Sequence, residues 1–417
     1  MSEKAKVYFL TSLFPKELES EITLHSKGAI ANANNTLQWN LYSGLQKFYP
    51  NIFLLNFPNV GAYPTKYKKI FVSETNISLL DKTIGKSYSF LNLVFFKHYF
   101  KYLKIRSIVK NIFESLDESE KCIFYVYDLY PSFLKALYEL KNIYSSKKIY
   151  ICLIVPDLLG KTGSRESFLY NFVLNRDRTV VSNSLTIVDS FVLLSEQMRE
   201  QLPINGKKYT VVEGIYNDDL DPCERSDVSN LKILFYSGAM DERNGVLNLI
   251  KAFSNILDQD YRLVLCGDGP LKSDIIKLSE RDSRILYKGQ LPREQVLNIQ
   301  INSTLLINPR LPGQDFTKYS FPSKTMEYFA SGVPTLMYKL EGVPEEYFEH
   351  SFYLIDPSID ALKNKILEIC ENEPSVLKDK ALKARDFILT KKNARAQCEK
   401  IYNICNDLLE RKNENFN

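Results

Sequence analysis

Short apolar runs alternate along the chain with longer amphipathic stretches. Apolar runs bounded by glycine, proline or polar residues are typical of buried strands, whereas apolar residues three and four apart are typical of helices. In the first half, the pattern predicts strands over 7–13, 122–127, 149–156, 187–194 and 209–214. It predicts helices over 28–47, 92–115, 131–142 and 164–180. This alternation indicates parallel sheets joined by crossover helices.

The alternation restarts in the second half. Strands are predicted over 233–238, 261–267, 285–289, 303–309, 335–340 and 353–356. Helices are predicted over 245–258, 270–281, 293–300, 322–331, 359–371 and 375–413. The polar, acidic stretch before the restart contains Pro222 and is interpreted as a linker, residues 217–230.

We therefore expect an α/β protein with two doubly wound, Rossmann-like domains facing each other across a cleft. The first domain covers 1–216 and the second 231–394, and a last helix at about 395–417 is expected to pack back on the first domain. The alternative is one long Rossmann-type domain with an appended helical domain. The fresh strand-turn-helix pattern at 233 favours two domains.

Composition fits a soluble globular protein, with 417 residues of which 45% are hydrophobic. The first residues, MSEKAKVYFLTSLFP, are interpreted as a buried strand rather than a signal peptide. The seven cysteines are scattered without a C-x-x-C pair, which is typical of reduced, cytoplasmic proteins. Three histidines far apart offer little material for a metal site, so no metal and no cofactor are expected.

Charge is one-sided in one region. Between Lys82 and Lys110 lie seven basic residues and no acidic one, interleaved with aromatic residues. The plain interpretation of 92–110 is an amphipathic helix with one face in the core. Its charge favours in addition a peripheral contact with phosphate head groups of a lipid-linked acceptor, at the inner face of the cell membrane. A net charge of +4 over the whole chain argues against nucleic acid as a partner.

Three predicted strand ends in the second half carry glycine. In open parallel sheets, ligands bind where strands end and helices begin, and backbone N–H groups there favour phosphate. A single glycine at such a turn is usually structural, but three turns in one domain favour a nucleotide site. The glycines are Gly238, Gly267, Gly269 and Gly289.

The segment 308–336 carries the strongest candidate chemistry. Residues 320–323 are typical of a helix entry, and Glu327 would lie in the second turn of the helix that follows. A carboxylate there can accept hydrogen bonds from a ribose diol, and the cations Arg310 and Lys324 suit a diphosphate. The alternative is a solvated helix face.

This segment resembles the signature region of retaining nucleotide-sugar glycosyltransferases of family 4, which have the GT-B fold. The resemblance runs from ILFYSGAMDERNGVLNLIKAF through LVLCGDGP and ILYKGQLP to SFPSKTMEYFASGVP. In the first domain, PDLLG, LLSEQM and VVEGI resemble family members in order and spacing.

The resemblance implies roles for individual positions. Glu327 matches the second glutamate of the family's E-x7-E pair, which typically holds the ribose. The first glutamate, which usually contacts the donor sugar, is replaced by Tyr319. The family's Arg and Lys after the first strand of the donor domain fall on Ala239 and Asn244, with Arg243 next to the latter.

We infer that Arg243, Arg310 and Lys324 share the diphosphate charge instead, and we count Ser323 among the donor-binding residues. Such a site needs no metal, because cations and helix N-termini neutralise the departing diphosphate. The resemblance implies front-face attack with retention of configuration.

The acceptor side offers weaker signals. Asp157 follows a predicted strand and could orient an acceptor hydroxyl, although a turn or cap role suits it equally. Gly28, Asn32 and Asn35 open a predicted helix and offer a close backbone approach and amide groups for sugar hydroxyls. Helix capping is an equally good interpretation of the asparagines.

The sequence thus predicts a metal-independent transferase that moves a hexose-type sugar from a UDP- or GDP-sugar to a glycan or lipid-linked acceptor in surface polysaccharide or glycoconjugate synthesis. One alternative is a non-catalytic partner subunit, which the replacements Tyr319, Ala239 and Asn244 motivate. A sugar-nucleotide epimerase needs acid and base groups for which three dispersed histidines are poor material.

Overall fold

The computed structural model describes residues 5–28, 30, 32–79, 82–158, 168–217 and 231–411. The chain forms two compact units, and the first contains both the beginning and the end of the chain. Unit 1 comprises Met1–Ile215 and Ala394–Asn417, and unit 2 comprises Tyr216–Asn393. All but the first residue of the predicted linker 217–230 lies outside the described residues.

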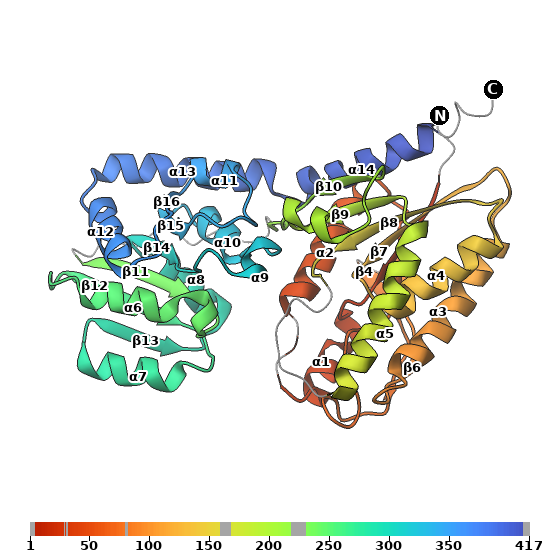
Figure 1. Cartoon of the computed structure of the whole chain (residues 1–417), viewed down its shortest axis with the longest axis horizontal. Coiled ribbons are helices and arrows are strands. Elements are labelled where there is room, and N and C mark those ends of the chain that lie inside the picture. The colour runs from red at the N-terminus through yellow and green to blue at the C-terminus, as the bar shows by residue number, and fades with distance from the viewer. Residues whose placement is uncertain are drawn as a thin grey trace. The chain divides into compact units, whose positions relative to one another are not determined.

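Unit 1 is built on an eight-stranded sheet (Figure 1). Its order is β10 (Lys208–Val211), β9 (Ser190–Leu193), β8 (Lys148–Val155), β7 (Lys121–Tyr127), β1 (Lys6–Thr11), β2 (Phe53–Asn56), β5 (Lys82–Ser87) and β4 (Thr75–Leu79). All neighbours are parallel except β4, which runs antiparallel to β5. A separate antiparallel ribbon pairs β3 (Phe71–Val72) with β6 (Phe90–Leu91).

Helices flank this sheet on both faces. They are α1 (Lys16–His25), α2 (Asn32–Gln46), α3 (Lys97–Glu114), α4 (Pro131–Ile143), α5 (Phe168–Ser184) and α14 (Ala394–Arg411), with the short 3-10 turns η1 (Leu185–Ile187) and η2 (Glu196–Gln201). On one face, α2 and α14 pack against side chains of β1, β7 and β8. On the other face, Phe113 of α3 meets Phe124 of β7 edge to face.

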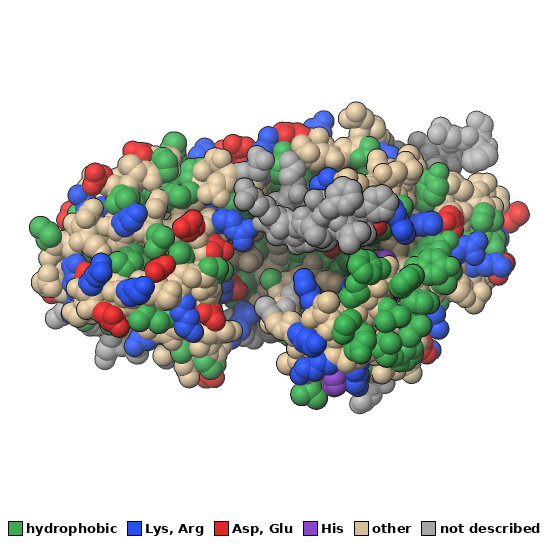
Figure 2. All heavy atoms as spheres, turned by 60° about the horizontal axis from the view of Figure 1, so that its bottom comes forward, with side chains coloured by type: hydrophobic (Ala, Val, Ile, Leu, Met, Phe, Trp, Pro, Cys, Tyr) green, Lys and Arg blue, Asp and Glu red, His purple; other side chains and the backbone are tan. Residues whose placement is uncertain are grey.

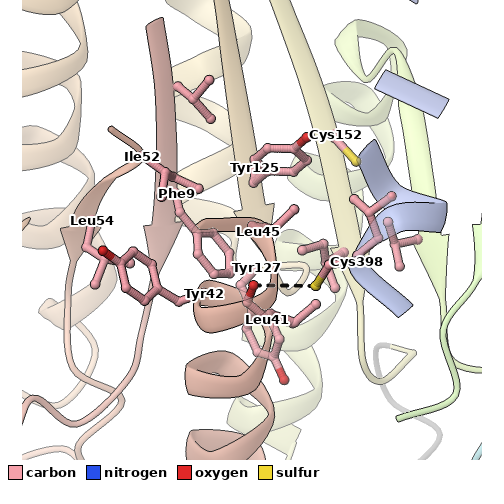
Figure 3. Packing of buried hydrophobic residues seen from close by; sticks show 14 of the residues in the cluster. Phe9, Leu41, Tyr42, Leu45, Ile52, Leu54, Tyr125, Tyr127, Cys152 and Cys398 are labelled. Atoms are coloured by element: carbon pink, nitrogen blue, oxygen red, sulfur yellow. Dashed lines mark hydrogen bonds between the residues drawn. The ribbon is translucent and has the colours of Figure 1, made fainter. Parts of the chain in front are cut away.

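The core under α2 and α14 is aromatic (Figure 3). Tyr42 and Leu45 of α2 and Cys398 of α14 reach it from the helices, while Phe9 and Tyr125 reach it from the sheet. The Cys398 thiol donates to the Leu41 carbonyl at 3.5 Å. The last helix therefore completes the core of the first unit.

Unit 2 is built on a six-stranded parallel sheet. Its order is β13 (Ile285–Gly289), β12 (Tyr261–Cys266), β11 (Lys232–Ser237), β14 (Leu305–Asn308), β15 (Thr335–Tyr338) and β16 (Phe352–Leu354). The strand order reverses between β11 and β14, which makes this pair the topological switch point.

Helices cover both faces of this sheet as well. On one face lie α6 (Val246–Ser254), α7 (Lys272–Arg281) and α12 (Ile359–Cys370). On the other lie α8 (Arg293–Ile301), α10 (Lys324–Ala330), α11 (Glu346–Glu349) and α13 (Pro374–Lys391). The connections also hold η3 (Glu242–Asn244) and α9 (Asp315–Lys318).

The predicted α/β class with two doubly wound sheets is confirmed. The cleft expected between the domains stays a prediction. A single helix over 375–413 is wrong, because α13 ends and α14 begins around Lys392 and Asn393. There the chain leaves unit 2. The Tyr216 amide donates to the Lys392 carbonyl, which in an uninterrupted helix would accept a hydrogen bond from a later residue of the same helix.

Candidate functional site

The glycine-bearing turns of unit 2 lie together at the carboxyl edge of its sheet. Gly238 follows β11, Gly267 follows β12, and Gly289 ends β13. Backbone hydrogen bonds tie the turns to one another, since the Gly238 amide donates to the Cys266 carbonyl and the Gly267 amide to the Gly289 carbonyl. The turns after β11, β12 and β13, which we call the shelf, are therefore linked to one another next to the switch point.

Close packing explains two of these glycines. Gly267 has a φ of +139°, and a Cβ there would overlap the Gly238 carbonyl oxygen. A Cβ on Gly269 would crowd the backbone of Met240. Gly289 has a φ of +64° with open space around it, so only its backbone conformation favours glycine. Gly267, Gly269 and Gly289 thus have structural reasons, and the contact of the turn glycines with a donor stays a prediction.

The sequence reasoning missed Gly245, which links η3 to α6. Its φ is +71°, and a Cβ there would overlap the carbonyl oxygen of Pro309, directly after β14. The approach of two turns across the switch point therefore depends on this glycine. Its place at a predicted helix start, before VLNLIKAF, is the signal that could have found it.

Two of the predicted cations converge on one aromatic ring. The Arg310 guanidinium lies 5.0 Å from the Phe316 ring centre, and the Arg243 guanidinium lies 5.8 Å from it. Burial lowers the pKa of Arg310, and the positive charge of Arg243 acts in the same direction. Arg243 is 61% exposed and its partner Asp241 is 3.6 Å away. Asp241 offsets part of this positive charge, but two guanidinium groups beside one carboxylate still leave a net positive charge suited to an anion.

The loop after β11 closes on itself, where the family has its Arg and Lys. The Asn244 side chain donates to the Ala239 carbonyl at 3.3 Å, and the Asn244 amide donates to Asp241 at 2.9 Å. Asp241 thereby caps η3. Asn244 is thus a structural residue of this loop, and its neighbour Arg243 supplies the positive charge.

Helix α10 is anchored at the switch point by two of its side chains. The Ser237 amide, at the end of β11, donates to the Tyr328 hydroxyl at 2.9 Å. The Asn308 side chain, at the end of β14, donates to the Thr325 hydroxyl at 3.2 Å. Both helix residues are fully buried. The ends of the two central strands thus fix where α10 presents its remaining side chains.

Glu327 and Lys324 are partly exposed on α10 and pair with each other. The Lys324 ammonium donates to the Glu327 carboxylate at 2.8 Å, with side chains 39% and 26% exposed. The predicted ribose ligand and the predicted phosphate ligand are therefore partners in this structure. Ser323, at the N-cap of α10, is exposed and makes no side-chain cap bond. Tyr319 is 8% exposed, and its role in gripping a sugar stays a prediction.

The asparagines of α2 make structural contacts in unit 1. The Phe14 amide donates to the Asn35 side-chain oxygen at 2.7 Å, which fixes the loop after β1. Asn32 is exposed at the first position of the helix, and Gly28 is exposed with a φ of +100° and open space around it. Asn35 thus serves the fold with its oxygen, and acceptor binding by these three residues stays a prediction.

Asp157 lies just beyond β8, with its side chain exposed at the carboxyl edge of the first sheet. Desolvation by the surrounding protein raises the pKa of its carboxyl above the ordinary value. Its role in orienting an acceptor stays a prediction.

A second carboxylate, Asp128, lies at the same edge and was missed. It follows β7, has a φ of +72°, and its amide donates to the Ile154 carbonyl of β8. Its own carboxylate accepts from the Leu129 amide at 2.7 Å. Burial, reinforced by the charge of Asp157, raises the pKa of Asp128 to about 7. Strained backbone and a shifted pKa together favour a functional role.

Residues 224–386, which carry the shelf, the arginines and α10, match the family model described as Glycosyl transferases group 1. Most of the second unit is therefore similar to this glycosyltransferase family. The predicted enzyme class is thereby confirmed for this domain. No protein with a curated description matches the sequence significantly.

Solved glycosyltransferase structures share the fold of the whole chain. Sucrose-phosphate synthase from Thermosynechococcus elongatus is 13% identical with a TM-score of 0.60, covering 97% of this chain and 99% of its own. Anabaena HepE in complex with UDP is 14% identical with a TM-score of 0.64, covering 96% and 100%. The lipopolysaccharide outer core galactosyltransferase WaaB is 14% identical with a TM-score of 0.57, covering 96% and 99%. The chain therefore has the GT-B fold over nearly its full length.

Proposed function

We propose that the chain is a retaining, metal-independent glycosyltransferase of family 4. It moves a hexose-type sugar from a UDP- or GDP-sugar to a glycan or lipid-linked acceptor in surface polysaccharide or glycoconjugate synthesis. The observation that carries this proposal is the group of Arg243, Arg310, Lys324 and Glu327 beside the switch point of a group 1 glycosyltransferase domain. The likeness to HepE, solved with UDP, and to the galactosyltransferase WaaB supports it.

Charge assigns the donor roles. The two guanidinium groups beside Phe316 bind the diphosphate and stabilise the negative charge that develops as the sugar leaves. The carboxylate of Glu327 accepts from the ribose hydroxyls. Lys324, now bound to Glu327, meets a phosphate oxygen when the nucleotide is present, which keeps the charge of the pair balanced.

On the acceptor side, Asp157 and Asp128 are the groups able to orient a hydroxyl at the edge of the first sheet. Asn32, Asn35 and Gly28 contribute polar contacts to the sugar. We place the reaction in the cytoplasm, at the inner face of the cell membrane. None of the described helices is long and apolar enough to span a bilayer.

Calorimetric titration with UDP and GDP tests the donor site. The wild type is expected to bind one of them, and Glu327→Ala should weaken that binding about tenfold or more, since a hydrogen bond to a charged group is worth about 1.5–3 kcal/mol. Glu345→Ala is the matched control, because Glu345 pairs with Lys339 and its side chain is 77% exposed in the same unit.

Release of free nucleotide from a panel of UDP- and GDP-sugars tests turnover. Glu327→Ala with wild-type binding and turnover would show that the donor site is wrongly assigned. A wild type that binds neither nucleotide would favour the non-catalytic partner subunit, which the Tyr319 and Ala239 replacements motivate.

A further inference from the structure

Helix α3 has an unusual distribution of polar and apolar side chains. Its buried face contains Lys101, whose ammonium donates to the carbonyls of Phe57 and Pro58 at 3.1 and 3.0 Å. Its exposed face carries Tyr99 and Leu103, and Phe96, at the N-cap, continues them as one stripe. The rest of the buried face is apolar, with Ile105, Val109 and Phe113, so the core does not account for the second, exposed apolar stripe.

The β3–β6 ribbon continues this apolar surface. Val72 and Phe90 pair across the ribbon and are buried, whereas Phe71 and Leu91 pair across it and are exposed. Four residues after Leu91, Phe95 is 73% exposed and has a φ of +69°, which is uncommon for a bulky residue. The ribbon and the start of α3 thus present six large apolar side chains, which we call the apolar patch: Phe71, Leu91, Phe95, Phe96, Tyr99 and Leu103.

Figure 2 shows hydrophobic side chains gathered on unit 1, with Lys and Arg side chains at the border. The loop that leads into β3 supplies Lys66 and Lys68, and residues 61–72 contain no acidic residue. The Lys68 ammonium donates to the Leu24 carbonyl. Within the described ranges, neither Lys66 nor Lys68 forms an ion pair.

The basic charge predicted for 92–110 is largely neutralised. Arg106 meets Glu139 at 3.1 Å, Lys110 meets Glu114 at 3.5 Å, and Lys104 lies 3.9 Å from Glu74. Lys97 donates to the Val60 carbonyl at 2.9 Å and Lys101 is buried, so neither presents its charge at the surface as the exposed Lys66 and Lys68 do. The charge of this helix therefore does not support a membrane contact. The features that do are the apolar patch and the neighbouring loop with Lys66 and Lys68.

We propose that the apolar patch docks on an anionic phospholipid bilayer and inserts its side chains among the lipid head groups and upper acyl chains. The proposal rests on the proposed function in one respect, since a lipid-linked acceptor would be reached from that surface. Aromatic and leucine side chains beside lysines are the combination that binds at such interfaces. Lys66 and Lys68 supply the charge complementary to anionic head groups.

Buried contacts hold the patch rigid. The ammonium groups of Lys97 and Lys101 bind three carbonyls of the loop after β2, and Lys101 also lies 4.3 Å from the Phe90 ring centre. The Val94 amide donates to the Tyr63 carbonyl, and the Asn92 amide to that of Ile70. Exposed rings on a fixed support lose little conformational entropy on insertion, which favours binding.

Co-sedimentation of the full chain with vesicles tests the proposal. With equal parts of phosphatidylglycerol and phosphatidylcholine, the double variant Phe95→Asn/Phe96→Ser should lower the partition coefficient about tenfold or more. Asn at position 95 suits the left-handed backbone. The control is Leu257→Ser/Ile355→Ser in unit 2, where the side chains are 85% and 71% exposed, and it should bind as the wild type does.

A second measurement separates insertion from charge attraction. Phe96→Trp should show a blue-shifted emission with these vesicles, and Lys66→Glu/Lys68→Glu should weaken binding to them and leave binding to pure phosphatidylcholine unchanged. Wild-type protein that fails to sediment, or the double aromatic variant sedimenting as well as wild type, overturns the proposal. A concentration-dependent dimer of the wild type that the double variant abolishes also overturns it, because the patch would then bind a second copy.

UDP and GDP binding in the absence of vesicles distinguishes the two proposals. Nucleotide binding without vesicle binding would leave the donor site intact and remove the docking surface. Vesicle binding without nucleotide binding would do the opposite.

Discussion

Replacing Asp128 by asparagine is expected to remove a pH-dependent loss of stability in unit 1. Burial raises the pKa of this carboxyl from 3.8 to about 7, so the folded protein holds the proton more tightly than the unfolded chain. The stabilisation from this group is therefore greatest below the pKa of the unfolded chain and is lost as the pH rises through the pKa of the folded protein. Between pH 5 and pH 8 the wild type should lose about 3 kcal/mol through this group.

Asparagine keeps the oxygen that accepts from the Leu129 amide and tolerates the left-handed backbone, so the variant should lose only the ionisation. The single tryptophan, Trp39, lies in α2 and donates to the Phe14 carbonyl, so its fluorescence reports the unfolding of unit 1. Urea titrations at pH 5 and pH 8 should show the variant gaining about 3 kcal/mol on wild type as the pH rises.

The control is Asp117→Asn, at an exposed position of the same unit. Parallel pH profiles for wild type and Asp128→Asn would refute the reasoning and show that the Asp128 carboxyl is solvated in the folded state.

Three further outcomes are expected. Gly267→Ala should destabilise unit 2 by about 3 kcal/mol or more, because its φ is +139° and the added Cβ overlaps the Gly238 carbonyl. Gly289→Ala should cost about 1–2 kcal/mol, since only its backbone conformation is unfavourable for alanine. Calorimetric melting compares the two variants, and equal losses of stability would contradict the packing argument. Tyr328→Phe leaves the buried Ser237 amide without its acceptor and should cost about 1–3 kcal/mol, with Tyr353→Phe, at an exposed position, as the control in the same melting experiment. Phe316→Ala should weaken the binding of UDP or GDP about fivefold in calorimetric titration, since it removes the ring that contacts both guanidinium groups. Unchanged affinity would mean that other contacts position Arg243 and Arg310.

Periodicity predicts the sheets well where the strands are apolar on both faces. The runs ILFYSG and YRLVLCG became β11 and β12, and the turns after them lie at one edge of one sheet. Arg310 was singled out by its charge and position and Arg243 by the family resemblance, and the structure brings both to one ring. Parallel topology makes such convergence predictable, because all the strand ends face the same way.

No element was predicted between residues 48 and 91, where β2 to β6 lie. Strands such as β4 (TNISL) and β5 (KTIGKS) are short and polar, and only their place at the end of a sheet makes them strands. The helix α1 was also missed, since KELESEITLH buries only Leu18 and Ile22.

Long-range partners account for the other differences. The acids that neutralise α3 include Glu74 and Glu139, which lie tens of residues away in the sequence. The pKa of Asp128 is raised by burial in the folded protein, reinforced by the charge of Asp157 just beyond β8, and its amide is held by the Ile154 carbonyl. The sequence around each of these residues contains no trace of such contacts, so no local pattern could predict them.

The return of α14 to the first unit has a consequence for biosynthesis. Ala394, Cys398, Ile401 and Cys405 belong to a core that otherwise consists of residues from the first half of the chain. On the ribosome, unit 2 can fold once Asn393 has been translated, while one sheet face of unit 1 stays uncovered until α14 has followed. A nascent chain stalled before α14 should therefore expose unit 1 to chaperones and proteases while unit 2 is already native.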